Sequence, residues 1–477
     1  MKERGFILIL AIALLLRAIG AAGSLWLDEI WSLNIALGLP SSAAPSFGAM
    51  LRQSLAENCH PLTAIWMFCV GDTAHAWLYR LPALLFSVAS LWLAVRIGEE
   101  LEGPRSRWVY ALFFGGSFFL IEYGTEARGY SGVIFHCLAG FAILQRDLTR
   151  RKLPRYWNGI FGLNAVLGLL SHPIFLGFLL GAGGWSLFRI AIETRFRDRV
   201  FLRDSLERFA LPVVVCLGLA FSRLELQTQA SGVESSFGAA AADLLHYGFG
   251  APRWSSALFA TAALLVVLVV RAFQVAESDD ERSSLRLLSF LVVAPFLLLA
   301  ASSSSALSAR FLSPSVPFLY ILALRGVLRA PDSPQAVRVP APFLIGAFLV
   351  GHATLLLPFL QYGRGHYLEA LEQIAQSDQS PLIRVGVDHP FRSGTVIDYY
   401  GARLEPPRQF DKVRLKLVSA SNRPDWVLLH HVEDDDWAPQ SALERPGLRY
   451  ELRSTFPKFG PSGFHWYLYQ RTRAASE

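Results

Sequence analysis

Long apolar runs recur between residues 6 and 361 of this 477-residue chain. A transmembrane helix needs roughly 20 consecutive, mostly apolar residues, and many of the runs approach that length. Only 17% of the residues are charged, below the roughly 25% typical of soluble domains. The sequence therefore predicts a polytopic α-helical membrane protein. The apolar blocks lie at 6–23, 78–97, 108–122, 128–145, 157–171, 173–190, 208–223, 254–273, 285–303, 310–328 and 340–361.

One further apolar block, HPLTAIWMFCV at 60–70, is shorter than the roughly 17 residues that cross a bilayer. If it does not span, the most basic loops all fall on the side of the N-terminus, as the positive-inside bias requires. We therefore interpret 60–70 as juxtamembrane or re-entrant and expect about eleven spans. The N-terminus is then cytoplasmic, and the region from 362 lies on the outer face. The basic loops are those around Arg105, 145–155, 195–208, 279–286 and 325–338.

The first apolar block has the basic flank and apolar core of a secretory signal. Arg17 interrupts that core and the run is long, which favours an uncleaved first helix. The net charge of +6 does not indicate a nucleic-acid partner, because the basic residues lie in short loops where they set topology. The cysteines at 59, 69, 137 and 216 form no C-x-x-C pair, and we expect neither a disulfide framework nor a metal cluster.

The expected topology places the unusual polar motifs on the outer side. Charged residues at membrane depth are costly and normally face a cavity, pair with each other or mark a ligand site. Acids and arginines around one outer cavity suit a lipid-borne phosphate with a nearby base. The motifs are Asp28 and Glu29, His60-Pro61, IEYGTEARGYS (121–131) with Glu122, Glu126, Arg128 and Tyr130, SHP (171–173) with His172, and Arg310 in SSALSARFLSPSVPF (304–318).

The acidic pair, the His-Pro, the EARGY sequence and the late ARFLSPSVPF together resemble the membrane glycosyltransferases of the GT-C superfamily. The branch of protein O-mannosyltransferases and the lipid A aminoarabinose transferase is most similar. The resemblance covers roughly residues 1–361. It implies a bacterial inner-membrane enzyme that transfers a sugar, with inversion, from a polyprenyl-phosphate donor to a lipid, glycan or protein acceptor on the outer face.

Asp28 matches the catalytic Asp of that family, and an inverting transfer needs a base within reach of the acceptor hydroxyl. The alternative is that Asp28 only caps the amphipathic helix expected at 28–39. Glu29, the second catalytic candidate, could orient Asp28, raise its pKa by like-charge proximity, or be solvated.

Arg128 and Arg310 suit the donor phosphate, because a guanidinium can hold two phosphate oxygens and stays charged when partly buried. The alternatives are a salt bridge from Arg128 to Glu122 or Glu126, and an interfacial anchor for Arg310.

Tyr130 is a candidate phosphate ligand, with an interfacial anchor as the alternative. The candidate substrate contacts are His60, Glu126 and His172. The alternatives are that His60 merely shapes the end of its loop and that His172 merely makes a hydrogen bond at a helix end. A divalent cation is conceivable beside two acids and a His, yet no metal-ligand spacing such as H-E-x-x-H appears. We assign no metal and no cofactor.

The region 362–477 changes character, because charges become frequent and apolar runs become short. Alternating runs at 382–389, 425–432, 450–456 and 464–471 predict strands, and 364–376 has helical spacing. KFGPSG (458–463) is a plausible turn between the last two strands. We expect a small extracytoplasmic α/β domain. EDDD at 433–436 lacks the pattern of a calcium loop, so we interpret it as a solvated acidic turn.

Two other classes remain open. A flippase or transporter of polyprenyl-linked sugars would also have many spans, but no inverted repeat is evident. A non-catalytic lipid-binding subunit would keep Arg128 and Arg310 without needing Asp28. The long outer loop 24–77, with amphipathic stretches on both sides of SSAAPS (41–46), favours an enzyme whose acceptor enters from outside.

Overall fold

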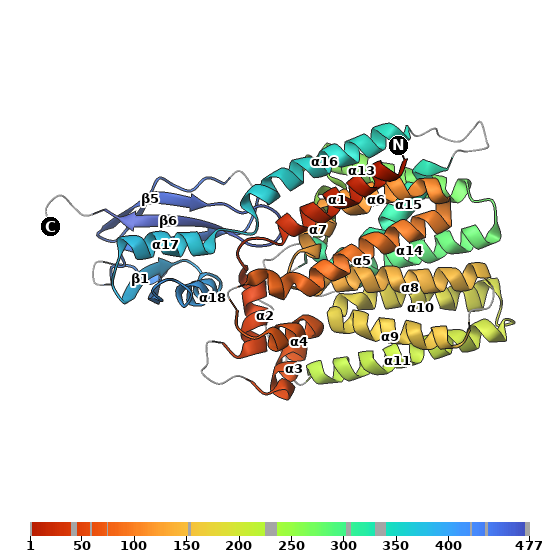
Figure 1. Ribbon diagram of the computed structural model, residues 1–477, viewed down its shortest axis with the longest axis horizontal. Helices are drawn as coiled ribbons and strands as arrows, with labels where there is room; N and C mark the ends of the chain where they lie inside the picture. The colour runs from red at the N-terminus through yellow and green to blue at the C-terminus, as the bar shows by residue number, and fades with distance from the viewer. Residues whose placement is uncertain are drawn as a thin grey trace. The chain divides into compact units, whose positions relative to one another are not determined.

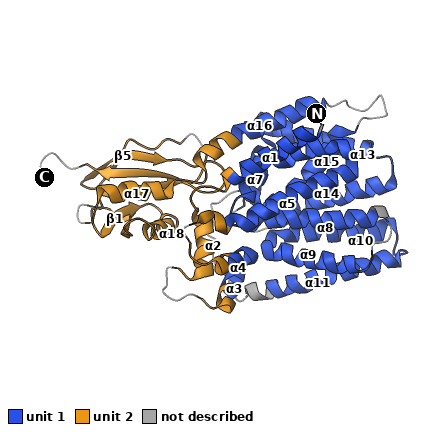
Figure 2. Ribbon diagram, viewed as in Figure 1, with its two compact units in different colours: residues 1–18, 51–66, 80–355 blue, residues 19–50, 67–79, 356–477 orange. Residues whose placement is uncertain are grey.

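The computed structural model describes most of the chain, and the parts that it describes form two compact units (Figure 2). Unit 1 comprises residues 1–18, 51–66 and 80–355, and unit 2 comprises 19–50, 67–79 and 356–477. The predicted outer loop 24–77 is therefore shared between the units. The described residues are 2–39, 45–57, 60–73, 75–150, 154–224, 236–301, 307–329, 340–419, 422–434 and 437–472.

Unit 1 is a bundle of apolar helices, and the described residues of each predicted apolar block lie mainly on helix (Figure 1). The helices that lie mainly in it are α1 (Lys2–Gly20), α5 (Ala76–Glu102), α6 (Arg107–Gly116), α7 (Phe118–Gly124), α8 (Tyr130–Arg150), α9 (Tyr156–Ser171), α10 (Leu176–Phe188), α11 (Arg199–Leu224), α12 (Phe237–Phe249), α13 (Ser255–Gln274), α14 (Asp279–Ala300), α15 (Val316–Leu328) and α16 (Ala341–Tyr362).

Five helical stretches of the described chain are long and apolar enough to cross a membrane by themselves. The protein is thus a multi-pass membrane protein, as predicted. The ambiguous block 60–70 forms the short helix α4 (Pro61–Val70), whose 10 residues extend only about 15 Å. The five stretches are Ala76–Glu102, Pro173–Glu193, Ser255–Gln274, Asp279–Ala300 and Ala341–Ser377.

Unit 2 contains a six-stranded mixed sheet with the strand order β2-β1-β3-β6-β5-β4. The pairs β2-β1 and β1-β3 are parallel, and the other pairs are antiparallel. The strands are β1 (Leu382–Val387), β2 (Gln409–Arg414), β3 (Trp426–His431), β4 (Ala442–Arg445), β5 (Leu448–Phe456) and β6 (His465–Arg471). Its helices are α2 (Leu27–Leu37), α17 (Tyr367–Ser377) and α18 (Pro390–Gly401), and α3 (Phe47–Ala56) crosses into unit 1.

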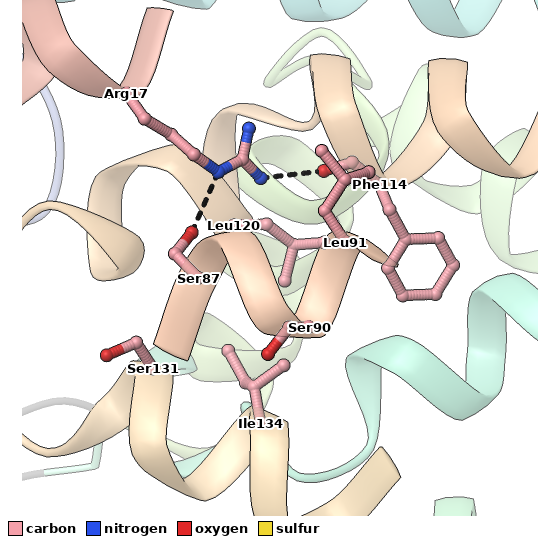
Figure 3. Close-up of a pocket in the computed structure, with 8 residues that line it drawn as sticks. All are labelled: Arg17, Ser87, Ser90, Leu91, Phe114, Leu120, Ser131 and Ile134. Atoms are coloured by element: carbon pink, nitrogen blue, oxygen red, sulfur yellow. Dashed lines mark hydrogen bonds between the residues drawn. The ribbon is translucent and has the colours of Figure 1, made fainter. Parts of the chain in front are cut away.

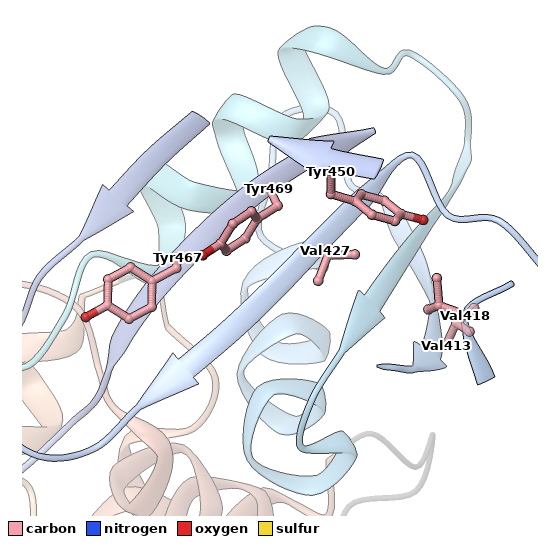
Figure 4. Close-up of a cluster of buried hydrophobic side chains, with 6 residues drawn as sticks. All are labelled: Val413, Val418, Val427, Tyr450, Tyr467 and Tyr469. Carbon is pink, nitrogen blue, oxygen red and sulfur yellow. The ribbon is translucent and has the colours of Figure 1, made fainter. Parts of the chain in front are cut away.

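Successive side chains of β6 point to opposite faces of the sheet, and both sets pack against buried residues. Trp466 meets Tyr367 of α17 edge to face, with ring centroids 5.1 Å apart. Tyr467 and Tyr469 point to the other face, where they join a buried cluster with Val427. Figure 4 shows this cluster across neighbouring strands. The sheet is therefore buried on both faces.

The predicted turn 458–463 joins β5 to β6, and Asp434 holds it. The Lys458 ammonium lies 2.7 Å from the Asp434 carboxylate, which also accepts from the Gly460 amide at 2.8 Å. Only 10% of the Asp434 side chain is exposed. The prediction of a solvated acidic turn is thus wrong for Asp434, because its charge is balanced inside the domain. Asp435 and Asp436 lie outside the described residues.

The predicted strands and the helix at 364–376 are confirmed by β1, β3, β5, β6 and α17. Among the cysteines, Cys69, Cys137 and Cys216 are free thiols, and Cys59 lies outside the described residues.

Candidate functional site

Three loops of unit 1 meet at the His60 ring, which is completely buried. Its Nδ1 lies 3.2 Å from the Ser171 carbonyl oxygen, and its Nε2 lies 2.6 Å from Nε of Arg128. A guanidinium can only donate, so Nε2 accepts and the Nδ1–H donates to Ser171. His60 is then a neutral ring that orients Arg128. The histidine, the EARGY loop and the SHP loop, predicted as separate motifs, are brought together here.

The electrostatic environment of His60 agrees with this tautomer. Burial lowers its pKa well below the usual range, and the positive charge of Arg128 lowers it further. Arg310 acts on the same ring in the same direction. His60 therefore stays neutral at physiological pH and keeps an acceptor directed at Arg128.

Glycine is required at position 129, between Arg128 and Tyr130. A Cβ atom there would lie 1.8 Å from the Ser171 carbonyl oxygen and 2.8 Å from His60 Nδ1. No side chain fits at those distances, so the contact between the EARGY and SHP loops depends on Gly129. It is absent from the residues predicted from the sequence, although a glycine between two site candidates is a signal for close backbone approach.

Tyr130 is the aromatic centre of this group. Its ring is completely buried, stacks 5.1 Å from His172 and meets His60 edge to face at 5.3 Å. Cζ of Arg128 lies 5.3 Å from its centroid. The interfacial-anchor alternative for Tyr130 is wrong, because the ring is enclosed by protein. His172 caps a short turn, as its Nδ1 accepts from the Ile174 amide at 3.0 Å, in agreement with the expected helix-end role.

Arg310 approaches the group from the short helix η4 (Ala309–Leu312) and is only partly buried. Its Cζ lies 5.5 Å from the Phe311 ring, and Phe311 lies 6.5 Å from His172. Glu126 is completely buried in the EARGY loop, and its carbonyl accepts from the Arg128 amide at 2.6 Å. We call His60, Arg128, Tyr130, His172 and Arg310 the basic-aromatic cluster.

The helix leading into the EARGY loop is broken, whereas the sequence predicts one span over 108–122. α6 ends at Gly116 and α7 begins at Phe118. Buried Arg17 stabilises the break, because its guanidinium donates to the carbonyls of Phe114 at 2.9 Å and Gly115 at 3.1 Å. Those carbonyls belong to a helix end and would otherwise lack partners. Figure 3 shows the guanidinium between the Phe114 carbonyl and Ser87, to which it donates at 2.8 Å.

The far side of the break is fixed as well. Ser117 caps α7 by accepting from the Leu120 amide at 3.3 Å, and its hydroxyl lies 2.8 Å from the Tyr320 hydroxyl. The Phe118 amide donates to His352 Nδ1 at 3.0 Å. The polar groups released by the break thus have partners on α15 and α16. The break before the EARGY loop is thus bonded to α1, α15 and α16, and Ser87 of α5 in turn accepts from Arg17.

The acidic pair lies in unit 2, in the first turn of α2. The N-cap residue is Trp26, and Glu29 accepts from the Trp26 amide at 3.2 Å. Asp28 is thus inside the first turn and does not occupy the N-cap position, whereas Glu29 makes the reciprocal bond of a capping box to the Trp26 amide. Asp28 is partly exposed, and its carbonyl accepts from the Ser32 hydroxyl at 2.9 Å.

Glu29 is completely buried, so the alternative that it is solvated is also wrong. Burial raises the pKa of the Tyr399 phenol on α18, and the Glu29 carboxylate acts in the same direction. Further contacts fix α2 within unit 2, because Tyr400 donates to the Leu25 carbonyl at 2.9 Å and Trp31 meets Phe391 edge to face at 5.1 Å. Of the two acids, Asp28 is the more accessible.

Within the described ranges, no three His, Cys, Asp or Glu side chains are grouped so that they could hold a metal ion.

No protein-family model and no curated protein sequence matches the chain. Among solved structures, it is similar to ArnT from Cupriavidus metallidurans in the apo state, with a TM-score of 0.53 and 12% identity over 90% of this chain and 93% of that one. It is also similar to ArnT bound to undecaprenyl phosphate, with a TM-score of 0.52 and 13% identity over the same shares. The likeness shows a shared fold, so the predicted polytopic α-helical membrane fold with a small C-terminal α/β domain is confirmed.

Proposed function

We propose that the protein is an inverting glycosyltransferase that moves a sugar from a polyprenyl-phosphate donor to a hydroxyl of a lipid, glycan or protein. The observation that carries the proposal is the Arg128 guanidinium, oriented by a neutral histidine beside a second arginine. The bound undecaprenyl phosphate of the similar ArnT structure supports the choice of donor class.

Arg128 and Arg310 are proposed to bind the donor phosphate. The hydrogen bond from Nε to His60 fixes the plane of the Arg128 guanidinium. A guanidinium that is already oriented loses less conformational entropy when it binds phosphate oxygens. Both side chains are partly exposed, so a ligand can reach them. As the sugar departs, negative charge grows on the phosphate, and fixed cations stabilise that charge.

Asp28 is proposed as the general base. Its carboxylate would take the proton of the acceptor hydroxyl while that oxygen forms a bond to the anomeric carbon. On the opposite face, the bond from that carbon to the phosphate oxygen breaks, and its electron pair leaves with the polyprenyl phosphate. Glu29 is proposed as a positioning residue, because its bond to the Trp26 amide fixes the first turn of α2.

The remaining candidates receive supporting roles. His60 is proposed to position Arg128, and the stacked rings of Tyr130 and His172 to form a wall of the donor site. Glu126 is proposed to accept hydrogen bonds from the sugar, since an ionised carboxylate only accepts. The active site is proposed to lie on the outer face, with the N-terminus in the cytoplasm, because the basic loops then lie inside.

The test is transfer of radiolabelled sugar from a panel of polyprenyl-phosphate sugars by the full-length protein in membranes. Arg128→Gln and Arg310→Gln should each raise the KM for the donor about tenfold or more, since a charge-assisted hydrogen bond contributes about 1.5–3 kcal/mol. Arg384→Gln is the matched control, because that half-exposed arginine pairs with Asp411 in the sheet of unit 2. Movement of the donor between leaflets without transfer would instead support a flippase. Donor binding with neither activity would support a lipid-binding subunit.

A further inference from the structure

A group of buried charges lies at the end of the unit 1 bundle opposite to Arg310. Arg310 follows the C-terminal end of α14, whereas Glu281 lies in the first turn of that helix. The 22 residues of α14 separate the two ends by about 33 Å. These buried charges are therefore independent of the basic-aromatic cluster.

Two acids at this end are shared by Arg325 of α15 and by Arg329, which follows the last residue of that helix. Arg329 lies 3.0 Å from Glu102 and 2.7 Å from Glu281. Arg325 lies 3.5 Å from Glu102 and 3.4 Å from Glu281. Each carboxylate is thus balanced by these two guanidinium groups.

Arg271, in the last turn of α13, is a third cation at the same end and is 4% exposed. Its Nη2 donates to the Arg329 carbonyl at 3.1 Å, so it caps the end of α15. Within the described ranges, its Nε and Nη1 have no hydrogen-bond partner. A buried charge without a counter-charge costs several kcal/mol, so an anion is expected beside Arg271.

An apolar cavity of about 210 Å³ extends along α13, α15 and α16 toward this end. Leu264, Leu265 and Leu268 line it from α13, and Leu268 is less than one helical turn from Arg271. Val327 lines it from α15, two residues before Arg329. The cavity and Arg271 are thus neighbours along two helices.

The surroundings of the cavity face the membrane. Val266, Val267 and Val270 are 63%, 42% and 50% exposed on α13, as expected for residues in contact with lipid. Ala347, on the α16 wall, is also exposed. An apolar cavity excludes water, so a hydrocarbon chain is the occupant that a membrane can supply.

We infer that this cavity and Arg271 form a binding site for an anionic glycerophospholipid, with the lipid phosphate at Arg271 and an acyl chain between α13, α15 and α16. The Arg271 guanidinium supplies charge complementarity, because its Nε and Nη1 have no partner among the described residues, and the cavity supplies the apolar contact. The site does not depend on the proposed transferase activity. Its role would be to stabilise the junction of α13 and α15, where Gly326 lets the helices approach closely.

The test is native mass spectrometry of the full-length protein in detergent, titrated with phosphatidylglycerol or with phosphatidylcholine carrying the same acyl chains. The wild type should bind the first phosphatidylglycerol at least tenfold more tightly than phosphatidylcholine. Arg271→Gln should remove that preference. Arg282→Gln is the matched control, since Arg282 is an exposed cation at the same end, paired with Asp279, and it should leave the preference unchanged.

A second variant tests the apolar cavity, and it keeps the inference testable if Arg271→Gln does not fold. Ala347→Trp fills the cavity from an exposed position and should weaken the binding of both lipids about tenfold. Equal binding of the two lipids to the wild type, or wild-type binding by either variant, would overturn the inference. It would also fail if equimolar undecaprenyl phosphate displaced the phosphatidylglycerol, because the cavity would then belong to the donor.

Discussion

The Nε–H of Arg128 donates to Nε2 of His60 over 2.6 Å, and the opposite ring nitrogen of His60 is held by the Ser171 carbonyl. The guanidinium is thus oriented through a neutral ring. A glutamine amide can reproduce this pattern, since its oxygen accepts and its nitrogen donates. We expect His60→Ala to raise the donor KM about tenfold and His60→Gln to recover part of that loss. Equal KM values for both variants and wild type would show that His60 does not position Arg128.

The lowered pKa of His60 also predicts a pH dependence of stability. Below about pH 6.5 the unfolded chain binds a proton at His60 that the folded protein excludes. This histidine therefore destabilises the folded state as pH falls from about 6.5 toward the folded pKa. Thermal unfolding in detergent at pH 7.5 and 5.0 should show a larger loss for wild type than for His60→Gln. An identical loss would mean that His60 protonates freely in the folded protein.

Gly129→Ala tests the contact between the EARGY and SHP loops. The added Cβ would collide with the backbone carbonyl of Ser171, so a shift of one loop is unavoidable. We expect a destabilisation of about 1–3 kcal/mol and a loss of donor affinity. Gly159→Ala is the matched control, because a Cβ there meets no atom within 4 Å and should stabilise α9 by up to about 1 kcal/mol. If the two variants behave alike, the close approach at Gly129 is not required.

Arg17→Lys tests the break between α6 and α7. Lysine keeps the charge but cannot reproduce the fork that reaches Ser87 and the carbonyls of Phe114 and Gly115. Each carbonyl left without a partner costs about 1–3 kcal/mol, so the thermal midpoint should fall clearly. Arg4→Lys on the exposed side of α1 should have no effect. An unchanged midpoint for Arg17→Lys would contradict the capping role.

Asp434 provides a test within unit 2. Burial raises the pKa of this carboxyl, but the His465 hydrogen bond and the Lys458 ammonium outweigh burial and hold the pKa below its ordinary value. The stabilisation is then complete above about pH 3.9 and is lost as pH falls through the folded pKa. At pH 7, Asp434→Asn should cost about 3 kcal/mol and speed hydrogen exchange at 457–464, and exposed Glu433→Gln should not. A difference that does not shrink as pH falls below about 3.9 would exclude the ion pair as its cause.

Sequence patterns predicted those helices and strands whose pattern of apolar residues is contained within the element itself. Apolar length indicates the spanning helices, and alternation indicates β1, β3, β5 and β6. The break at Ser117 was missed because its stabilising partner, Arg17, lies about one hundred residues earlier in the chain. β2 was missed because only Phe410 and Val413 are apolar in QFDKVR, and α18 because glycines interrupt PFRSGTVIDYYG.

In the candidate site, too, some features were predictable from the sequence, whereas others depend on contacts between distant residues. The motifs predicted that His60, Arg128 and His172 belong together, and the structure places them in one cluster. The different burial of Asp28 and Glu29 was not predictable, because the two acids are adjacent and only the start of α2 at Leu27 determines which one faces the interior. The need for Gly129 became evident only when the position of Ser171 was known.

The measurement that most directly tests the central claim is sugar transfer by Asp28→Asn, with Asp72→Asn as the matched control. Asp72 is a half-exposed acid of unit 2 that pairs with Arg403, and its loss should leave the rate unchanged. Removal of a general base should lower kcat about 100-fold or more while donor binding is retained. If Asp28→Asn transfers sugar at the rate of wild type and of Asp72→Asn, Asp28 is not the base and the proposed mechanism is wrong.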